Sequence, residues 1–524
     1  SRGSRRENVG CSNLCKKTRN LSSGLIFSPY PIGRHVHEIT TVGRLDTMES
    51  WDVIIVGSGP SALRAAIACE EAGTKPLIID EYGVGSASGS PPIAGLAASI
   101  DEVDSTSHLE DTLSAGGEST EQEVASRICK EGVRTLVELE RWGLVLRRRK
   151  GGLPHTSIVP GHKVARLTGC GDSTIREVTR VLEEQVIKRG IRRISDSLPL
   201  EIVSDNNQVR GIIFLDIISG EIVPIQAKSV ILATQGHQGL WSSPSEGAGT
   251  GSVLALSAGV ELRGMAKNPK HPLSVKDCGI HIPMDILASG GRIRRENGED
   301  VGPEEVIEGE ICVLDLRGLD SEESTWFAQI SSRVKDRLGL DTSREVIPIT
   351  PDVAYTIGGV PCDDFGRVIF EGYTQEGLPA KLWFTGLFAA GRSANTGMHG
   401  NAPLAGNLLL EELVTGKAAG SHASEWSSQE ELGGASLFET AVTGASNKIS
   451  SLSASGGIPV GQFSSELKSA ISSSSQKSAL ESVREMKESG IRLTDESLVM
   501  NTEMVDAIRL DGLASLAEAI LAGE

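Results

Sequence analysis

Apolar positions along this chain follow two patterns that alternate with each other. Continuous apolar runs, as at 53–56 and, nearly continuous, at 221–234, are typical of strands buried in a parallel sheet. Apolar residues at helical spacing over 121–143 and 173–190 predict amphipathic helices instead. Strand-like and helix-like segments in this order predict an α/β fold with a Rossmann-like domain.

A glycine-rich turn follows the first apolar run and opens a helix over 61–73. The next apolar strand ends at Asp80, about twenty residues further on, where a carboxylate can accept a hydrogen bond from a ribose hydroxyl. The glycines allow a tight turn and a close approach to a pyrophosphate, whose charge would rest on the helix N-terminus. The predicted dinucleotide site consists of Gly57, Ser58, Gly59, Pro60, Ser61, Ala62 and Asp80.

Further segments favour FAD over NAD. Residues 229–236 resemble a strand ending common in flavoproteins with two dinucleotide folds, and 383–392 resemble their last flavin-binding strand. The helix that begins near Asn407 can point its amides at the flavin ring and stabilise the reduced anion. Small residues over 84–99 permit a close approach by a ligand. Additional FAD contacts are therefore predicted at Gly95, Ala233, Thr234, Gly391, Asn407 and Leu408.

Composition and charge exclude several functions. The formal net charge is −18, and an acidic body repels phosphate backbones, so we exclude nucleic-acid binding. The eight cysteines are scattered without a Cys-x-x-Cys pair, which indicates a reducing compartment and argues against an iron–sulfur cluster in this chain. No apolar run reaches the ~18–20 residues that a membrane span needs.

These patterns divide the chain into five parts. Residues 1–47 lack a clear period and are either a basic transit-like extension or a translated upstream region, which we favour because a methionine follows directly. The FAD-binding domain is predicted at 48–237 and 349–422, interrupted by an α+β capping domain at 238–348. The rest, 423–524, is predicted to be an exposed serine-rich linker with weak helices, followed by a truncated helical C-terminal domain that ends in a pair of helices.

Several blocks resemble the flavoprotein subunits of succinate dehydrogenase and fumarate reductase, and the related L-aspartate oxidase. They include SHLEDTLSAGG at 107–117, VAYTIGGVPCDDFGRV at 353–368 and the segment 389–420, which contains AAGRSANTGMHGNAPLAGN. The resemblance implies a flavin-binding fold with an inserted capping domain, and hydride exchange between flavin N5 and a C4-dicarboxylate. It also implies an iron–sulfur partner subunit and a cytoplasmic location, at the inner face of a membrane through such partners.

The same resemblance assigns two catalytic histidines. His271 matches a histidine that contacts a substrate carboxylate, and His399 matches the histidine beside the flavin. Other positions depart from the family, since Ala354 stands in place of a histidine and Pro403 in place of a carboxylate-binding arginine. The histidine that tethers FAD covalently aligns with Ser88 or its neighbours, so the FAD is expected to be non-covalent.

Arginines differ from the family pattern as well. Arg392 stands where the family has an acid that holds the flavin ribityl hydroxyl. The bidentate arginine that is missing at Pro403 would supply charge-assisted hydrogen bonds worth roughly 1.5–3 kcal/mol each. Arg292, Arg294 and Arg295 either form a replacement anion site or a solvated charged turn, the interpretation we favour.

Three functions remain open from the sequence. The first is an FAD-dependent oxidoreductase that acts on a dicarboxylate. The second keeps the flavin chemistry and changes the substrate, as in L-aspartate oxidase or another enoate-reducing enzyme. The third is a flavin-binding assembly or electron-relay subunit without catalysis of its own. The matched blocks favour the first function, whereas the missing arginines favour the second or third.

Overall fold

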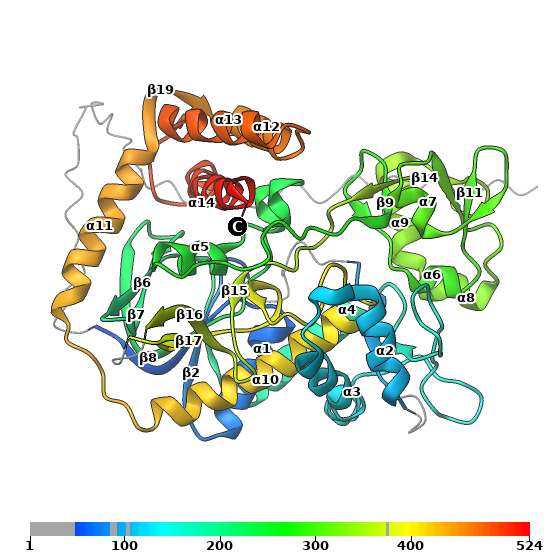
Figure 1. Ribbon diagram of the computed structural model, residues 1–524, viewed down its shortest axis with the longest axis horizontal. Coiled ribbons are helices and arrows are strands. Elements are labelled where there is room, and N and C mark those ends of the chain that lie inside the picture. The colour runs from blue at the N-terminus through cyan, green and yellow to red at the C-terminus, as the bar shows by residue number, and fades with distance from the viewer. Residues whose placement is uncertain (1–47, 84–91, 101–104, 374–376, 524) are drawn as a thin grey trace, which may run out of the picture. The chain divides into compact units, whose positions relative to one another are not determined.

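A mixed sheet forms the centre of the larger part of the molecule. The computed structural model describes residues 48–83, 92–100, 105–373 and 377–523. In this sheet the strand order is β16-β17-β7-β8-β1-β2-β5, and β6 pairs with β7 (Figure 1). The strands are β1 (Ser50–Val56), β2 (Pro76–Ile79), β5 (Arg192–Ile194), β6 (Ser197–Asp205), β7 (Gln208–Asp216), β8 (Ile222–Leu232), β16 (Arg367–Tyr373) and β17 (Pro379–Ala389).

Three parallel strands end together at one edge of this sheet. β1 pairs in parallel with β2 and β8, and Val56 at its end lies opposite Ile79 and Leu232. β8 is only partly the parallel strand predicted, because its other neighbours are β17, which is parallel, and β7, which is antiparallel. The shared edge brings the residues that follow β1, β2 and β8 close together, which is where ligands bind in open α/β sheets.

Helices cover the sheet, and α10 packs against the start of α1 near the carboxyl ends of β1, β2 and β8. In α10 a Cβ added at Gly416 would lie 2.4 Å from the Ser61 carbonyl oxygen, and one at Gly420 would lie 2.3 Å from the Ala65 carbonyl oxygen. The backbones of α1 and α10 therefore touch, and only glycine fits at these crossing points (Figure 1). The helices are α1 (Pro60–Glu71), α2 (Ser105–Gly116), α3 (Gln122–Trp142), α4 (Thr174–Lys188), α5 (Thr250–Ser257) and α10 (Asn407–Ser427).

A second sheet, which we call the cap, has its own core of buried side chains that includes Leu273, Phe327 and Val334. Its strand order is β10-β9-β14-β13-β11-β12. The predicted boundary at residue 238 is too early, because Leu254 and Met265 pack into the core of the larger sheet. The cap elements are β9 (His271–Val275), β10 (Ile280–His281), α6 (Asp285–Ala288), β11 (Arg292–Arg295), β12 (Asp300–Val301), α7 (Pro303–Ile307), β13 (Cys312–Asp315), α8 (Ser321–Trp326), α9 (Ala328–Leu338) and β14 (Ile347–Asp352).

Short strand pairs connect these layers. One pair is antiparallel, and the other pair is parallel. They are formed by β3 (Leu96–Ala97) with β4 (Leu167–Thr168), and by β15 (Val360–Pro361) with β18 (Ala394–Asn395).

The C-terminal region differs from its prediction in two respects. The serine-rich stretch is helical rather than a linker, because sparse apolar side chains such as Phe438 and Phe463, which are 0% and 1% exposed, anchor it to the body. The predicted helix pair is one helix that continues through Gly512. The elements are α11 (Ser436–Leu452), β19 (Ser453–Pro459), α12 (Val460–Ile471), α13 (Gln476–Ser489), β20 (Ile491–Arg492) and α14 (Thr502–Ala522).

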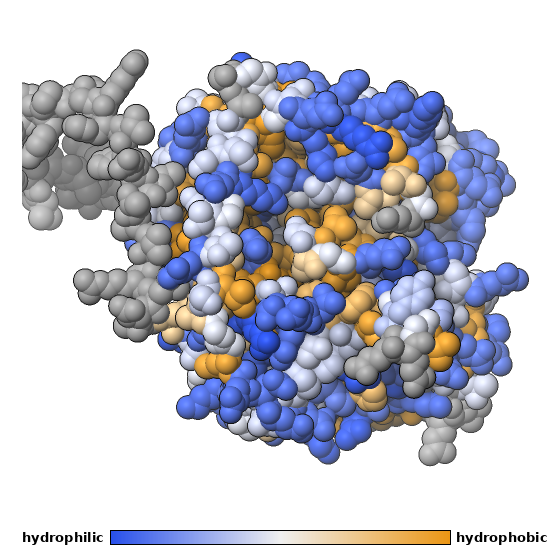
Figure 2. Space-filling view, turned by 60° about the vertical axis from the view of Figure 1, so that its left-hand side comes forward, coloured by the Kyte–Doolittle hydropathy of each residue, from blue (hydrophilic) through white to orange (hydrophobic). Residues whose placement is uncertain are grey.

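The face on the side of α11 combines hydrophilic and apolar surface. Figure 2 shows hydrophobic residues in a central depression, bordered by hydrophilic ones. A groove of about 80 Å³ lies between β6, α5, α11 and α14. Within the described residues, no helix is both long and apolar enough to cross a bilayer.

Candidate functional site

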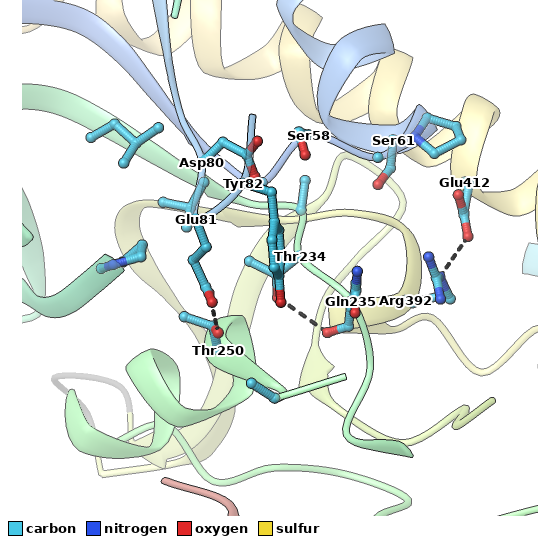
Figure 3. A pocket seen from close by; sticks show the side chains of 18 of the residues that line it. Ser58, Ser61, Asp80, Glu81, Tyr82, Thr234, Gln235, Thr250, Arg392 and Glu412 are labelled. Carbon is cyan, nitrogen blue, oxygen red and sulfur yellow. Dashed lines mark hydrogen bonds and ion pairs between the residues drawn. The ribbon is translucent and has the colours of Figure 1, made fainter. Parts of the chain in front are cut away.

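The shared strand edge borders a cavity, which we call the dinucleotide cavity (Figure 3). Its walls come from the turn after β1, the end of β2, the end of β8 and the start of α5, together with Arg392 and Glu412. The predicted residues that line it are Gly57, Ser58, Gly59, Pro60, Ser61, Asp80, Ala233 and Thr234. Two of the sequence patterns, far apart in the chain, therefore meet at one site.

The turn after β1 has the geometry that a pyrophosphate requires. Gly57 has a φ of 121°, and a Cβ there would lie 2.3 Å from the Ala233 carbonyl oxygen. Gly59 precedes α1 without a side-chain cap, and a Cβ built on it meets no atom within 4 Å. Pro60 opens the helix, where its missing N–H is no loss. The uncapped N–H groups at the start of α1 therefore fit a phosphate charge.

Two carboxylates follow β2 at the opposite wall. Asp80 is 3% exposed, and its Oδ2 lies 2.5 Å from Nη2 of Arg193. Burial raises the pKa of Asp80, while the Arg193 guanidinium opposes that rise. Glu81, which the sequence patterns did not indicate, accepts a hydrogen bond from Thr250 at 2.5 Å (Figure 3). It also pairs with Arg509 of α14 at 3.0 Å. The wall thus depends on a residue more than four hundred positions away along the chain.

Arg392 has a buried acidic partner that the sequence did not reveal. Its Nε lies 2.9 Å from Oε1 of Glu412 on α10, and the two side chains are 8% and 2% exposed (Figure 3). Burial raises the pKa of Glu412, and the Arg392 charge lowers it. The acid missing from position 392 is thus supplied from the following helix, so the cavity keeps a carboxylate beside a cation.

A larger cavity of about 460 Å³, which we call the cap cavity, lies between the cap and the loop that leads into α10. Its volume falls in the usual range for small-molecule sites, roughly 300–1,000 Å³. Its lining is mostly apolar and includes Met284, Ile307, Pro403 and Leu404. A ligand here would be held mainly by apolar contact.

Two polar side chains of the cap cavity, His271 and Tyr355, lie close together. The Nε2 atom of His271 lies 2.7 Å from the carbonyl oxygen of Ile282, so it must donate the hydrogen bond. Burial lowers the pKa of His271 to about 3, and the imidazole is therefore neutral. Burial raises the pKa of Tyr355 to about 12, and its ring centroid lies 6.4 Å from that of His271. The phenol keeps its proton at neutral pH.

The charges of the cap cavity are unsuited to a dicarboxylate. No lysine or arginine stands among the described residues that line it, whereas Glu304 and Glu308 of the α7 region do. Arg294 and Arg295 do not replace the lost arginine. Their guanidinium groups are committed to ion pairs with the acids Glu299, Asp300, Glu310 and Asp315. The arginine-rich segment is thus strand β11 of the cap sheet rather than the predicted solvated turn, and Arg294 and Arg295 are ion-paired on it.

The remaining predicted residues fall into different surroundings. Leu408 lines the cap cavity, together with His271. Asn407 is buried, its Oδ1 accepts a hydrogen bond from Nε2 of His108 at 2.8 Å, and its Nδ2 donates to Thr112 at 2.9 Å, so it fixes the start of α10. Ala62 is fully buried inside α1. The structure does not bring the two predicted catalytic histidines together, since His399 lines neither cavity.

Two glycines and one serine complete the predicted set. A Cβ on Gly391, whose φ is 61°, would lie 2.4 Å from the Ser61 hydroxyl, which places this turn against the start of α1. A Cβ on Gly95 would lie 2.5 Å from the Thr168 carbonyl oxygen, so Gly95 permits the β3–β4 contact. Ser88, the basis for expecting non-covalent FAD, lies outside the described residues.

Fold and site together define a dinucleotide-binding protein with a capping sheet over a separate small-molecule cavity. A family model described as an FAD binding domain matches residues 52–409. Because this match covers well over half of the chain, the protein belongs to that family of FAD-binding proteins.

Known relatives agree with this assignment. The chain is 25% identical over 527 residues to the fumarate reductase flavoprotein subunit of Escherichia coli, covering 90% of this chain and 85% of that protein. It is 30% identical over 414 residues to L-aspartate oxidase of Mycobacterium leprae, covering 72% of this chain and 74% of that protein. A solved E. coli quinol fumarate reductase chain superposes on this chain with a TM-score of 0.81 at 24% identity. The match covers 91% of this chain and 89% of that chain.

These comparisons confirm the predicted fold class and the predicted cofactor. The chain is an FAD-dependent oxidoreductase of the succinate dehydrogenase and fumarate reductase flavoprotein type. At this level of identity the family does not define the substrate.

Proposed function

We propose that this flavoenzyme acts on an uncharged, largely apolar substrate in the cap cavity rather than on a dicarboxylate. The observation that carries the proposal is the cavity of about 460 Å³ with a neutral His271, two glutamates and no lysine or arginine among its described lining residues. A dicarboxylate would lose water on both carboxylates there without gaining a cation, which is strongly unfavourable. Apolar contact with Leu404 and Leu408 suits an uncharged molecule.

The proposed FAD contacts are the predicted residues of the dinucleotide cavity. The start of α1 receives the pyrophosphate, and Asp80 faces the ribose at the end of β2. Arg392 and Glu412 hold each other in place where the flavin chain would pass. When bound, FAD supplies a group that accepts or donates a hydride.

Tyr355 is proposed as the proton donor of this reaction. Its hydroxyl has no hydrogen-bond partner within the described part of the chain, and its pKa of about 12 keeps it protonated. It can therefore donate to a substrate carbonyl oxygen or to a carbon atom that receives charge. His271 is held by its Nε2–H on Ile282, which leaves Nδ1 as an acceptor. In this role His271 orients the substrate or Tyr355 rather than binding a carboxylate.

An anaerobic flavin spectrum tests the substrate class. Succinate, L-aspartate and fumarate, each added separately to the oxidised or the dithionite-reduced protein, are expected to leave the flavin spectrum unchanged. An uncharged α,β-unsaturated ketone such as cyclohexenone is expected to reoxidise the reduced protein. Bleaching by succinate or reoxidation by fumarate would restore dicarboxylate chemistry and contradict the proposal. Bleaching by L-aspartate alone would favour an L-aspartate oxidase reaction.

We also propose that electrons reach or leave the flavin through an iron–sulfur partner, which would place the chain at the cytoplasmic face of a membrane. Two relatives of this chain are named as flavoprotein subunits, which supports a partner of this kind. A tagged chain purified from its native cells is expected to retain a second polypeptide with stoichiometric iron and acid-labile sulfide. Purification of the flavoprotein alone, active with a soluble acceptor, would contradict this.

A further inference from the structure

A separate polar cavity lies outside the two cavities described above. It has a volume of about 70 Å³, and its walls come from the residues before α3, the segment after α5, and the loop between β18 and α10. None of the residues that line it lines the dinucleotide cavity or the cap cavity. We call it the His399 cavity, and its ionisable lining residues are Glu121, Arg263, Lys267, His399 and Glu411.

The buried wall of this cavity carries an imidazole with one open nitrogen. His399 is 5% exposed, and its Nε2 lies 2.8 Å from Oε2 of Glu411. The Glu411 carboxylate also accepts a hydrogen bond from Thr396. Because a carboxylate only accepts, Nε2 of His399 must donate. Nδ1 is buried and has no hydrogen-bond partner. A buried polar atom left without a partner is unfavourable, so a ligand that uses Nδ1 is stabilised.

Two cations line the same cavity without partners. Among the described residues, neither Arg263 nor Lys267 forms a side-chain hydrogen bond or an ion pair. Their backbones are nonetheless fixed. Arg263 exchanges hydrogen bonds of 2.9 and 3.0 Å with Gly359, and the Lys267 N–H donates to Gly264 at 3.0 Å.

The acids of the cavity do not neutralise these cations. Glu411 is already held by His399 and Thr396. Glu121 is exposed, and its side chain lies over Gly397, so it forms no ion pair across the cavity. The cavity therefore offers two cationic side chains and one buried ring nitrogen to an incoming ligand.

We propose that the His399 cavity binds a small oxyanion between Arg263, Lys267 and Nδ1 of His399, with one proton between the anion and that nitrogen. A site for one water needs roughly 10–15 Å³, so about 70 Å³ suits an anion of a few heavy atoms. Acetate and inorganic phosphate share the required chemistry. The cavity also shares the second turn of α10 with the dinucleotide cavity, because Glu411 holds His399 while the next residue, Glu412, pairs with Arg392.

Calorimetric titration of the FAD-loaded protein with acetate, phosphate and sulfate, each added separately in the same buffer, tests this site. Saturable binding with one site per chain is expected for at least one anion. The double variant Arg263→Met/Lys267→Met is expected to bind it at least about tenfold more weakly, because two charge-assisted contacts are lost. A preference for acetate would point to a carboxylate metabolite, and a preference for phosphate to a phosphorylated or inorganic ligand.

A matched control separates the site from the net charge. Arg292→Met/Lys276→Met removes the same charge from two exposed residues that line none of the three cavities, and its affinity is expected to equal that of the unmodified protein. An equal loss in both double variants, or no saturable binding to the unmodified protein at tens of millimolar anion, would overturn the proposal. Flavin absorbance verifies that each variant is folded. Because the titration uses no substrate, its failure would leave the proposed reaction untouched.

Discussion

Replacing Arg392 with methionine is expected to lower the free energy of unfolding by about 3–5 kcal/mol, because a buried carboxylate loses the cation that pairs with it. Glu412 is 2% exposed at its side chain, and the nearest cationic atom lies 2.9 Å away on Arg392. Both residues line the dinucleotide cavity, so the variant is also expected to purify with less FAD. Chemical denaturation and the ratio of flavin to protein absorbance measure the two effects.

A second substitution and a change of pH show whether the lost stability comes from an unpaired buried charge or from lost packing. Glu412→Gln added to the Arg392 variant is expected to recover most of the stability, since no buried charge remains. Without Arg392 the folded-state pKa of Glu412 is raised further above its unfolded value, so stability is kept in acid and lost as the pH rises. The loss should therefore be larger at about pH 8 than at about pH 5.

The exposed pair of Arg127 with Asp364 supplies the control for this experiment. Its side chains are 34% and 48% exposed, and Arg127→Met is expected to change stability by less than about 1 kcal/mol. An Arg392 variant that is no less stable than this control would show that Glu412 is neutral in the native protein.

Replacing Tyr355 with phenylalanine is expected to lower kcat by about 10²–10⁴-fold with whichever uncharged substrate reoxidises the flavin, because a proton donor is lost. KM should change little, since the ring remains in place. FAD content should be unaffected, because Tyr355 lines the cap cavity and not the dinucleotide cavity. Anaerobic stopped-flow measurement of flavin reoxidation resolves the step directly.

Tyr373→Phe removes the same hydroxyl from a residue that is 72% exposed, and its rate should match that of the unmodified protein. An unchanged kcat in the Tyr355 variant would assign the proton to another donor. His271 would then be the next residue to test, although its neutral imidazole is already committed through Nε2 to Ile282.

Local sequence patterns predicted the parts of the fold that local chemistry determines. Gly57 and Gly59 indicated the turn after β1, because a positive φ and an open approach are properties of one or two residues. The helix predicted over 121–143 is α3, Gln122–Trp142. The serine-rich stretch was predicted wrongly as an exposed linker. A few deeply buried residues such as Phe438 decide whether it folds, and these do not show in its average composition.

Contacts between distant segments were beyond the reach of these patterns. Glu412 gave no signal as the partner of Arg392, since two adjacent glutamates on a helix resemble an ordinary solvated face. His271 and His399 stood in family-like blocks, yet the chain places them in different cavities. A motif records the order of residues along the chain, whereas the fold places His271 on β9 of the cap and His399 in the loop before α10.

The ion pair between Glu81 and Arg509 also sets an order of events during protein synthesis. Glu81 is made early and ends up 9% exposed at its side chain, but its cation belongs to α14. A ribosome must add more than four hundred further residues before that cation exists. Until then the second carboxylate of the β2 wall lacks its partner and remains in contact with water. The nascent FAD-binding domain therefore carries an unfinished wall, which only the folding of α14 completes.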